Sequence, residues 1–254
     1  MKKTLIITGF ICIFAGFLYA ADKIKVPVNS PSVRVKHTSP KTVVTLKTSL
    51  PVPSPPSILT AKFIKDARID GFKNEKIMTE PVVLNDGDND LSAKVYTGYI
   101  GPGIYIYAEV KDDMPGRNTR SGAGIWNGDS VEICVSTSPR SDKNRRSFGI
   151  KDFRIGIKAA EPPEMWNYTK NHSIKTEISY KKSGGGYVLE AVIPWREVDR
   201  GCFCGLKNRQ TAFDLVINDS DEENGRETQA RWRGDYSYSM NPSQWGTIVF
   251  DTRQ

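Results

Sequence analysis

The stretch from Ile125 to Ile133, with the sequence IWNGDSVEI, decides the fold of this chain. Trp126 and a polar turn stand directly before a strand in which apolar and polar residues alternate. Because successive side chains of a strand point to opposite faces, one face here carries Val131, Ile133 and Val135. The other face carries Glu132. The apolar face predicts a core strand, and Trp126 beside Glu132 predicts a binding surface.

Short alternating runs continue on both sides of this stretch, separated by Gly, Asp and Asn. They predict strands at Ala93–Ile100, Gly103–Lys111, Ser130–Ser136, Asp152–Ala159, Ser173–Lys181, Tyr187–Ile193, Ala212–Asn218, Thr228–Arg233 and Gly246–Asp251. The glycines of Lys182–Gly186 predict a hairpin turn, and Pro194–Val198 predicts one short helical turn. Many short strands with little helix predict an all-β domain, an antiparallel β-sandwich over residues 59–254.

Residues 1–20 have the pattern of a secretory signal peptide. Lys2 and Lys3 precede the apolar run Leu5–Phe17, and small residues follow near Ala20. An uncleaved membrane anchor is the alternative, although the run is short for a bilayer span. No second apolar run is long enough to cross a bilayer. We therefore expect a secreted or periplasmic protein that has no stable membrane insertion after cleavage.

The net charge of +7 comes from the N-terminal part of the chain. Residues 1–58 hold eight of the 36 Lys and Arg but one of the 29 acidic residues, which leaves 28 of each in residues 59–254. A neutral domain behind a basic tail is not the electrostatic pattern of a nucleic-acid binder. Residues 21–58 are rich in Pro, Ser and Thr, so they predict an extended spacer.

The cysteines do not form a disulfide framework. Cys12 leaves with the signal peptide, and Cys134, Cys202 and Cys204 remain. Two states are consistent with the sequence: one disulfide from Cys134 to Cys202 or Cys204, or three reduced thiols. A Cys-x-Cys pair without matching histidines does not support a zinc site.

Seven segments, in order along the chain, carry a resemblance to the family 9 carbohydrate-binding modules and their wider superfamily of sugar- and haem-binding sandwiches. They are Ala67–Gly71, Ile104–Asp113, Trp126–Ile133, Phe153–Ile155, Gly185–Trp195, Val216–Asp221 and Asn241–Gly246. Together they cover about residues 60–251. The resemblance implies a jelly-roll-like sandwich without catalytic activity, commonly attached to a polysaccharide-degrading enzyme. We expect a saccharide or polysaccharide as its partner, no nucleic acid, and a monomer.

The resemblance also implies a site. Trp126 would stack on a sugar ring, and Glu132 and Arg154 would hydrogen-bond the hydroxyls of that ring. The chemistry is sound, because a pyranose has an apolar face that suits an indole and hydroxyls that need directional partners. Strand alternation places Arg154 off the core, next to Gly156, which would leave room for a ligand. The alternatives are a buried loop anchor for Trp126 and an internal salt bridge between Glu132 and Arg154.

Two positions depart from the family pattern. Family members place a second tryptophan, which stacks on the other side of the sugar, where this chain has Ser239. Tyr236 or Tyr238 would have to supply this second aromatic surface. A polar position of the family's site is Val216 here. Trp166 and Tyr168 lie in an irregular loop, Glu161–His172, and a second contact surface is one of the roles open to them. Trp195, Trp232 and Trp245 are expected to be structural.

Two other functions and one further site are consistent with the sequence. A haem-binding or electron-transfer sandwich would have to use Met114, Met165 or His172 as axial ligands. A glycoside hydrolase would need two converging carboxylates, and no pair is evident, although a role as an accessory part of a hydrolase system remains. Asp219 and Asp221, with Asn218, Glu222 and Glu223, could hold calcium; a solvated acidic turn is the alternative.

Overall fold

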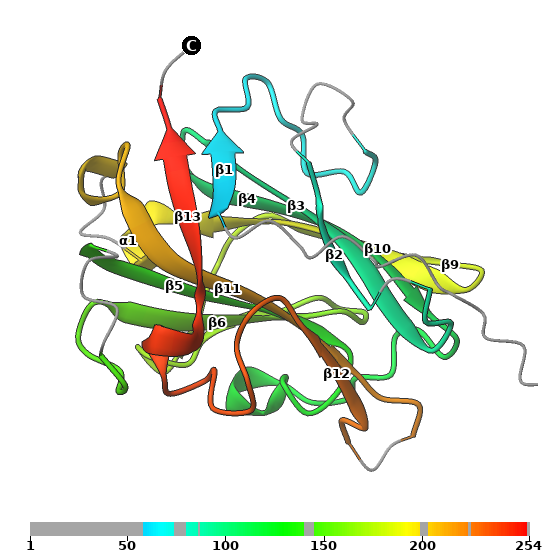
Figure 1. Ribbon diagram of the computed structural model, residues 1–254. Helices are drawn as coiled ribbons and strands as arrows, with labels where there is room; N and C mark the ends of the chain where they lie inside the picture. The colour runs from blue at the N-terminus through cyan, green and yellow to red at the C-terminus, as the bar shows by residue number, and fades with distance from the viewer. Residues whose placement is uncertain are drawn as a thin grey trace, which may run out of the picture. The chain divides into compact units, whose positions relative to one another are not determined.

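Two β-sheets pack against each other through their apolar faces (Figure 1). The eight-stranded sheet has the order β1-β13-β11-β5-β6-β7-β8, with β12 also paired to β11. Its strands are β1 (Ile58–Lys62), β5 (Ser130–Pro139), β6 (Asp152–Lys158), β7 (Met165–Asn167), β8 (His172–Ser173), β11 (Gln210–Asp219), β12 (Thr228–Arg231) and β13 (Gly246–Asp251). The five-stranded sheet has the order β2-β3-β4-β10-β9. Its strands are β2 (Val82–Leu84), β3 (Leu91–Ile100), β4 (Gly103–Asp112), β9 (Ile178–Ser183) and β10 (Gly186–Pro194). The predicted all-β sandwich of two sheets is confirmed.

The computed structural model describes residues 58–73, 80–85, 87–139, 145–198, 203–222 and 225–252. All of them belong to one compact unit, residues 51–254. The predicted signal peptide and the predicted spacer up to residue 57 lie outside the described residues. The helical segments that the structure describes are short: α1 (Trp195–Val198), η2 (Gly122–Gly124), η3 (Phe203–Gly205) and η4 (Pro242–Gln244). No described helix is long and apolar enough to span a membrane.

The core lies between the sheets, where the strand alternation predicts it. Val131, Ile133 and Val135 of β5 are buried in the main apolar cluster. They face the buried residues of β4, which include Ile104, Ile106 and Val110. Trp195, Trp232 and Trp245 are also buried, as expected for structural tryptophans. The residues before and after each inward-facing residue point to the outer face of the sheet, so polar side chains that could bind a ligand lie there.

The outer face of the five-stranded sheet is covered by the chain itself. Ile64 packs on Tyr96, Tyr105 and Tyr107 in a second apolar cluster. Glu190 of β10 fastens the covering segment, because its carboxylate accepts hydrogen bonds from the backbone N–H groups of Asp70 and Gly71 and from the Tyr105 hydroxyl. The outer face of the eight-stranded sheet carries a smaller apolar cluster that includes Val216, Tyr238 and Trp245, and beside it a network of polar side chains.

The structure differs from the sequence prediction at short or edge elements. β1, β2 and β7 were not predicted, and Ser173–Lys181 divides into β8 and β9 with a non-strand segment between them. β1 pairs with β13 in parallel, so the sandwich is not wholly antiparallel. The predicted helical turn is α1, and the predicted hairpin joins β9 and β10.

Candidate functional site

Cross-strand pairing gathers polar residues on the outer face of the eight-stranded sheet. Directly paired residues share a face of a sheet. One row across the sheet runs Arg231, Val216, Glu132, Gly156 and Trp166. A neighbouring row runs Gln229, Asn218, Ser130 and Lys158, and a third runs Asp214, Cys134 and Arg154. We call this face, with Trp126, Arg226 and Tyr238 beside it, the outer site.

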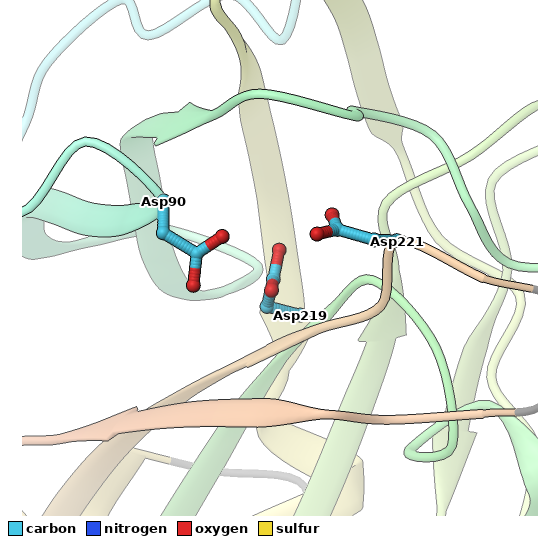
Figure 2. A group of neighbouring side chains, drawn as sticks. All are labelled: Asp90, Asp219 and Asp221. Carbon is cyan, nitrogen blue, oxygen red and sulfur yellow. The ribbon is translucent and has the colours of Figure 1, made fainter.

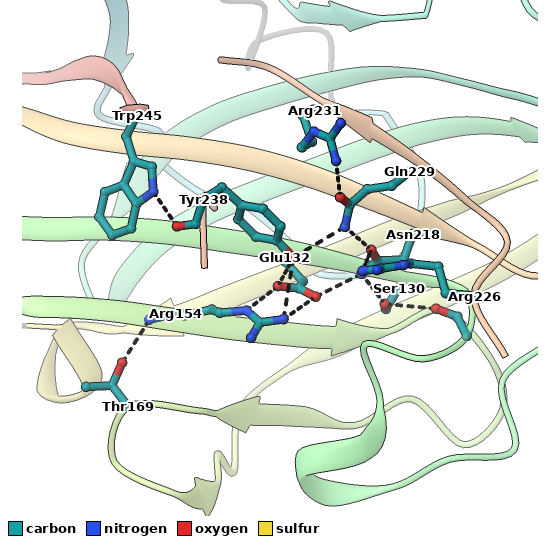
Figure 3. A network of polar contacts seen from close by, with 11 residues as sticks. Ser130, Glu132, Arg154, Thr169, Asn218, Arg226, Gln229, Arg231, Tyr238 and Trp245 are labelled. Atoms are coloured by element: carbon teal, nitrogen blue, oxygen red, sulfur yellow. Dashed lines mark hydrogen bonds and ion pairs between the residues drawn. The ribbon is translucent and has the colours of Figure 1, made fainter. Parts of the chain in front are cut away.

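Glu132 lies at the centre of the outer site as a buried, fully paired carboxylate (Figure 3). Its side chain is 0% exposed. Oε1 accepts from Arg154 Nη2 at 2.9 Å and from Asn218 Nδ2 at 2.9 Å. Oε2 accepts from Arg154 Nε at 2.5 Å and from the Tyr238 hydroxyl at 2.9 Å. With four donors and no exposed surface, Glu132 is not placed to accept a hydrogen bond from a sugar, so the internal salt bridge is the arrangement observed.

Arg154 is held between two tyrosine rings. Its guanidinium carbon lies 4.3 Å from the ring centroid of Tyr168 and 5.5 Å from that of Tyr238. Burial lowers the pKa of Arg154, but the Glu132 carboxylate outweighs it, so the net shift of the pKa is upward. The side chain is 17% exposed. Among the described residues Nη1 has no hydrogen-bond partner and is not a buried atom, so two N–H donors of Arg154 remain available.

Tyr168 occupies the space above Gly156. A Cβ added at Gly156 would lie 2.6 Å from the Tyr168 hydroxyl oxygen. The backbone N–H of Tyr168 donates to the Arg154 carbonyl, which fixes the tyrosine over this part of β6. The expectation that Gly156 opens the backbone to a ligand is therefore wrong, because the glycine admits an aromatic ring of the chain itself.

A chain of hydrogen bonds extends the outer site onto β12. Asn218 Oδ1 accepts from Gln229 Nε2 at 2.6 Å and from Arg226 Nη1 at 3.3 Å. Gln229 Oε1 in turn accepts from Arg231 Nη1 at 2.5 Å. No pattern in the sequence predicted a site at Arg226, Gln229 or Arg231. Gln229 and Arg231 alternate with apolar residues along β12, which indicates that they share a face. That this face is the one of Asn218 and Val216 follows only from the register of β12 on β11, which the sequence does not give.

Trp126 stands at the end of this network, in the loop before β5. Asn118 holds the loop, because its side-chain amide donates to the carbonyls of Ile125 and Asp129. The ring of Trp126 is half-buried, and the Arg226 guanidinium carbon lies 5.1 Å from its centroid. Trp126 is thus an anchored aromatic with part of its surface free. Trp166 lies on the same outer face, packed near Gly122 of the loop.

Tyr236 and Tyr238 occupy different environments. Tyr238 is buried, bonds Glu132, and receives a hydrogen bond at its carbonyl from the Trp245 indole N–H. Burial raises the pKa of Tyr238. Tyr236 is 86% exposed, with the Arg231 guanidinium carbon 4.0 Å from its ring centroid. Of the two tyrosines, Tyr236 is therefore the one that can offer a second aromatic surface to a ligand.

A separate cluster of aspartates lies where the ends of the two sheets meet. Oxygens of Asp112, Asp129 and Asp219 approach one another within 4.8 Å, and so do those of Asp90, Asp219 and Asp221 (Figure 2). Asp112 and Asp219 are 1% and 2% exposed, and one carboxylate oxygen of each has no hydrogen-bond partner. Carboxylate oxygens crowded in this way are the ligands that calcium prefers.

The pKa values in the aspartate cluster show its unbalanced charge. Burial and the nearby Asp112 and Asp129 carboxylates raise the pKa of Asp219 to about 8. Burial, with Asp129, raises the pKa of Asp112 to about 7. Burial raises the pKa of Asp129 to about 6, although three backbone N–H groups oppose the shift.

The structure brings Asp219 and Asp221 together as the sequence analysis expected, but not Asn218. Because neighbouring strand residues alternate, Asn218 belongs to the outer site instead. Glu223 lies outside the described residues. Four further residues complete the cluster, come from distant parts of the sequence and were not predicted: Asp90, Asp112, Asp113 and Asp129.

The candidate haem ligands and the cysteines lie in other environments. Met165 is buried in the main core and His172 Nε2 lies 2.7 Å from Glu197 Oε2, so neither is placed as a free haem ligand. Met114, the third candidate, is an exposed residue. Cys134 is a buried thiol and Cys204 is exposed, and no disulfide joins these two residues. Burial raises the pKa of Cys134. Cys202 lies outside the described residues.

Comparison with known families and proteins points to one family. The sequence profile of the Carbohydrate family 9 binding domain-like family matches residues 66–253. The chain is 25% identical over 197 residues to Endo-1,4-beta-xylanase A of Thermotoga maritima, covering 75% of this chain and 17% of that protein. It is 26% identical over 179 residues to Exoglucanase XynX of Acetivibrio thermocellus, covering 68% of this chain and 15% of that protein. The chain thus corresponds to less than a fifth of the length of these relatives.

Two solved structures share the fold. A carbohydrate-binding module of family 9 from Caldicellulosiruptor kristjanssonii in complex with cellotriose superposes with a TM-score of 0.57 at 17% identity. The comparison covers 78% of this chain and 95% of that one. The same organism's module in complex with glucose gives a TM-score of 0.56, also at 17% identity, and covers 78% and 97% of the two chains.

Proposed function

This chain belongs to the Carbohydrate family 9 binding domain-like family, and on that premise we propose that it is an exported, non-catalytic protein that binds a saccharide at its outer site. The observation that carries the proposal is one network that begins at the anchored, half-buried Trp126 and runs through Arg226, Asn218 and Glu132. It ends at Arg154, whose Nη1 donors are free. Homologous modules bind cellotriose and glucose, which supports a sugar as the ligand.

Each residue of the outer site has a separate role in this proposal. Trp126 stacks on the apolar face of a sugar ring, and Arg154 donates hydrogen bonds to its oxygens. Glu132 is a positioning residue, because its bidentate pair with Arg154 fixes the direction of the guanidinium group. Tyr238 holds Glu132 from above, and the exposed Tyr236 supplies a second aromatic surface.

Calorimetry with mono- and oligosaccharides tests the proposal. A ligand of one ring should bind with about −4 to −8 kcal/mol, which corresponds to millimolar to micromolar affinity. Trp126→Ala should abolish the binding. Phe72→Ala is the matched control, because Phe72 is an exposed aromatic residue on the segment that covers the other sheet, and it should leave the affinity unchanged. The absence of any saccharide binding by the folded chain would refute the proposal.

Export is a separate part of the proposal and has its own test. It is supported by the basic residues Lys2 and Lys3 before the apolar run of residues 5–17. N-terminal sequencing of the protein recovered from the medium or periplasm should begin near Ala21. Recovery of a full-length chain from the cytoplasmic fraction would contradict export without affecting the binding proposal.

We also propose that the aspartate cluster holds calcium in a structural role. The support is a group of buried carboxylates, several of which have an oxygen without a hydrogen-bond partner. Within the described residues their hydrogen-bond donors are backbone N–H groups, and no cationic side chain is among them. Asp112 and Asp219, of different sheets, would supply ligands to the same ion. A cation there would offset the mutual repulsion of the carboxylates and join the sheets.

A further inference from the structure

Among the charged and amide side chains of the outer site, the groups that remain free to hydrogen-bond are donors. Both oxygens of Glu132 are occupied, and the amide oxygens of Asn218 and Gln229 already accept from arginines. Arg154 keeps the two N–H groups of Nη1. Arg226 and Arg231 each use one guanidinium nitrogen in these bonds, which leaves most of their donors available.

The outer site also carries a local excess of positive charge. Arg154 is neutralised by Glu132, but no described carboxylate lies within ion-pair distance of Arg226 or Arg231. The positive charge of Arg231 acts on the exposed Asp235, but this carboxylate accepts its hydrogen bonds from the backbone N–H and the hydroxyl of Ser237. Two arginines therefore face the ligand region without a paired anion.

This arrangement does not suit a neutral sugar ring well. Each hydroxyl of such a ring is both a donor and an acceptor, so a site that fixes it offers acceptors as well as donors. Val216, which pairs with Glu132 and Arg231 in the same row, is fully buried in a cluster with Tyr238 and Trp245 and offers no polar group. A carboxylate, in contrast, only accepts, and it pairs with a guanidinium group through two parallel bonds.

We propose that the saccharide bound at the outer site carries a carboxylate, as a uronic-acid residue does, and that Arg226 and Arg231 recognise this group. The inference rests on the proposed function, because it assigns the class of sugar to the same site. Trp126 contacts the ring, and the arginines that flank Asn218 and Gln229 contact the charged substituent.

Calorimetry on the full chain with matched sugars tests this inference. Glucuronic acid and glucose are compared, since they differ by a carboxylate in place of a hydroxymethyl group. The acid should bind at least about tenfold more tightly at low ionic strength, as two charge-assisted contacts allow. This advantage should shrink in about 0.5 M salt, because partly exposed charge pairs are screened, while glucose affinity should change little.

Variants assign the effect to the arginines. Arg231→Gln, alone or with Arg226→Gln, should bring the affinity ratio of acid to neutral sugar close to one. Arg68→Gln makes the same charge change in the segment over the other sheet, where Arg68 is exposed, and should leave the ratio unchanged. Thermal melting of each variant shows whether it is folded.

The outcomes separate the two proposals. Equal binding of both sugars, or tighter binding of glucose, would overturn the acidic-sugar inference and leave saccharide binding intact. No binding of either sugar would overturn both. An equal loss of affinity for both sugars in Arg231→Gln would show that the arginine supports the site by packing and does not recognise the carboxylate.

Discussion

At the scale of single residues, the Glu132–Arg154 pair controls the outer site. Its burial makes each partner depend on the other, since an unpaired charge in a protein interior is far more costly than an exposed one. The two ring contacts of Arg154 and the four donors around Glu132 hold the pair in one geometry. A change at either residue should therefore affect folding and binding together.

Glu132→Gln should destabilise the domain by about 3–5 kcal/mol, because it leaves the Arg154 charge without its counter-ion. Urea denaturation measures this loss as a lower midpoint at an unchanged slope. Glu109→Gln is the matched control: the Lys73–Glu109 pair is partly exposed, so its loss should cost at most about 1 kcal/mol. Equal costs for the two variants would contradict the central role of Glu132.

Gly156→Ala should cost about 1–3 kcal/mol by forcing the Tyr168 ring away from its position above β6. The same displacement removes one of the two rings that hold Arg154, so sugar affinity should fall as well. Melting curves and calorimetry measure the two effects. Gly184→Ala, at a hairpin glycine with nothing within 4 Å of an added Cβ, is the control. Unchanged stability of Gly156→Ala would show that Tyr168 moves freely.

The sequence predicted which side of the sheet Glu132 and Arg154 occupy, but not how many partners they have. Strand alternation placed Glu132 and Arg154 off the core, and it allowed the pair between them as an alternative. It did not show that Glu132 is saturated, because two of its donors, Asn218 and Tyr238, lie 86 and 106 residues away. The number of bonds to a buried group depends on such distant partners, which local periodicity does not contain.

At the scale of elements, predictability followed strand length and position. The long central strands β4, β5, β6 and β11 were predicted within a few residues, since their alternation continues over several pairs. β1, β2 and β7 have five, three and three residues, too few to show a period. The resemblance to known modules supplied the order of segments, but not the added parallel pairing of β1 with β13.

β1 should be necessary for a stable sheet edge, although it follows directly on the proline-rich segment. It pairs along its whole length with β13 and buries Leu59 and Ala61. A fragment of residues 64–254 should therefore melt at a lower temperature and aggregate through the exposed edge, whereas residues 51–254 should melt cooperatively. Calorimetry and light scattering compare the fragments. Identical melting of both would show that β1 adds nothing to the sheet.

At the scale of the whole molecule, the aspartate cluster adds a polar contact between two sheets that pack mainly through their apolar core. The Tyr99 hydroxyl, which donates to the Asp251 carbonyl, is another such contact. Asp112 ends β4 in one sheet and Asp219 ends β11 in the other. Without a cation, their crowded carboxylates oppose the packing of the sheets at this end. A bound calcium ion would convert the same contact into a stabilising one.

Calcium should raise the melting temperature by about 5–10 °C relative to protein in chelator, since binding at 100 times Kd adds about 2.7 kcal/mol. Asp219→Asn should reduce this response, and Asp70→Asn, at an exposed aspartate outside the cluster, should preserve it. Differential scanning calorimetry makes the comparison. The same melting temperature in calcium and in chelator would refute a calcium site, and an equal response to magnesium would refute its selectivity.

The burial of the Glu132–Arg154 pair has a consequence for how this chain can evolve. A sequence in which only one partner has changed would lose about 3–5 kcal/mol from a domain whose total stability is of the order of 5–15 kcal/mol. Such intermediates are removed by selection before the second change can arise. Lineages should therefore inherit the two positions as a unit, and where one has been replaced by an apolar residue, the other should be apolar too.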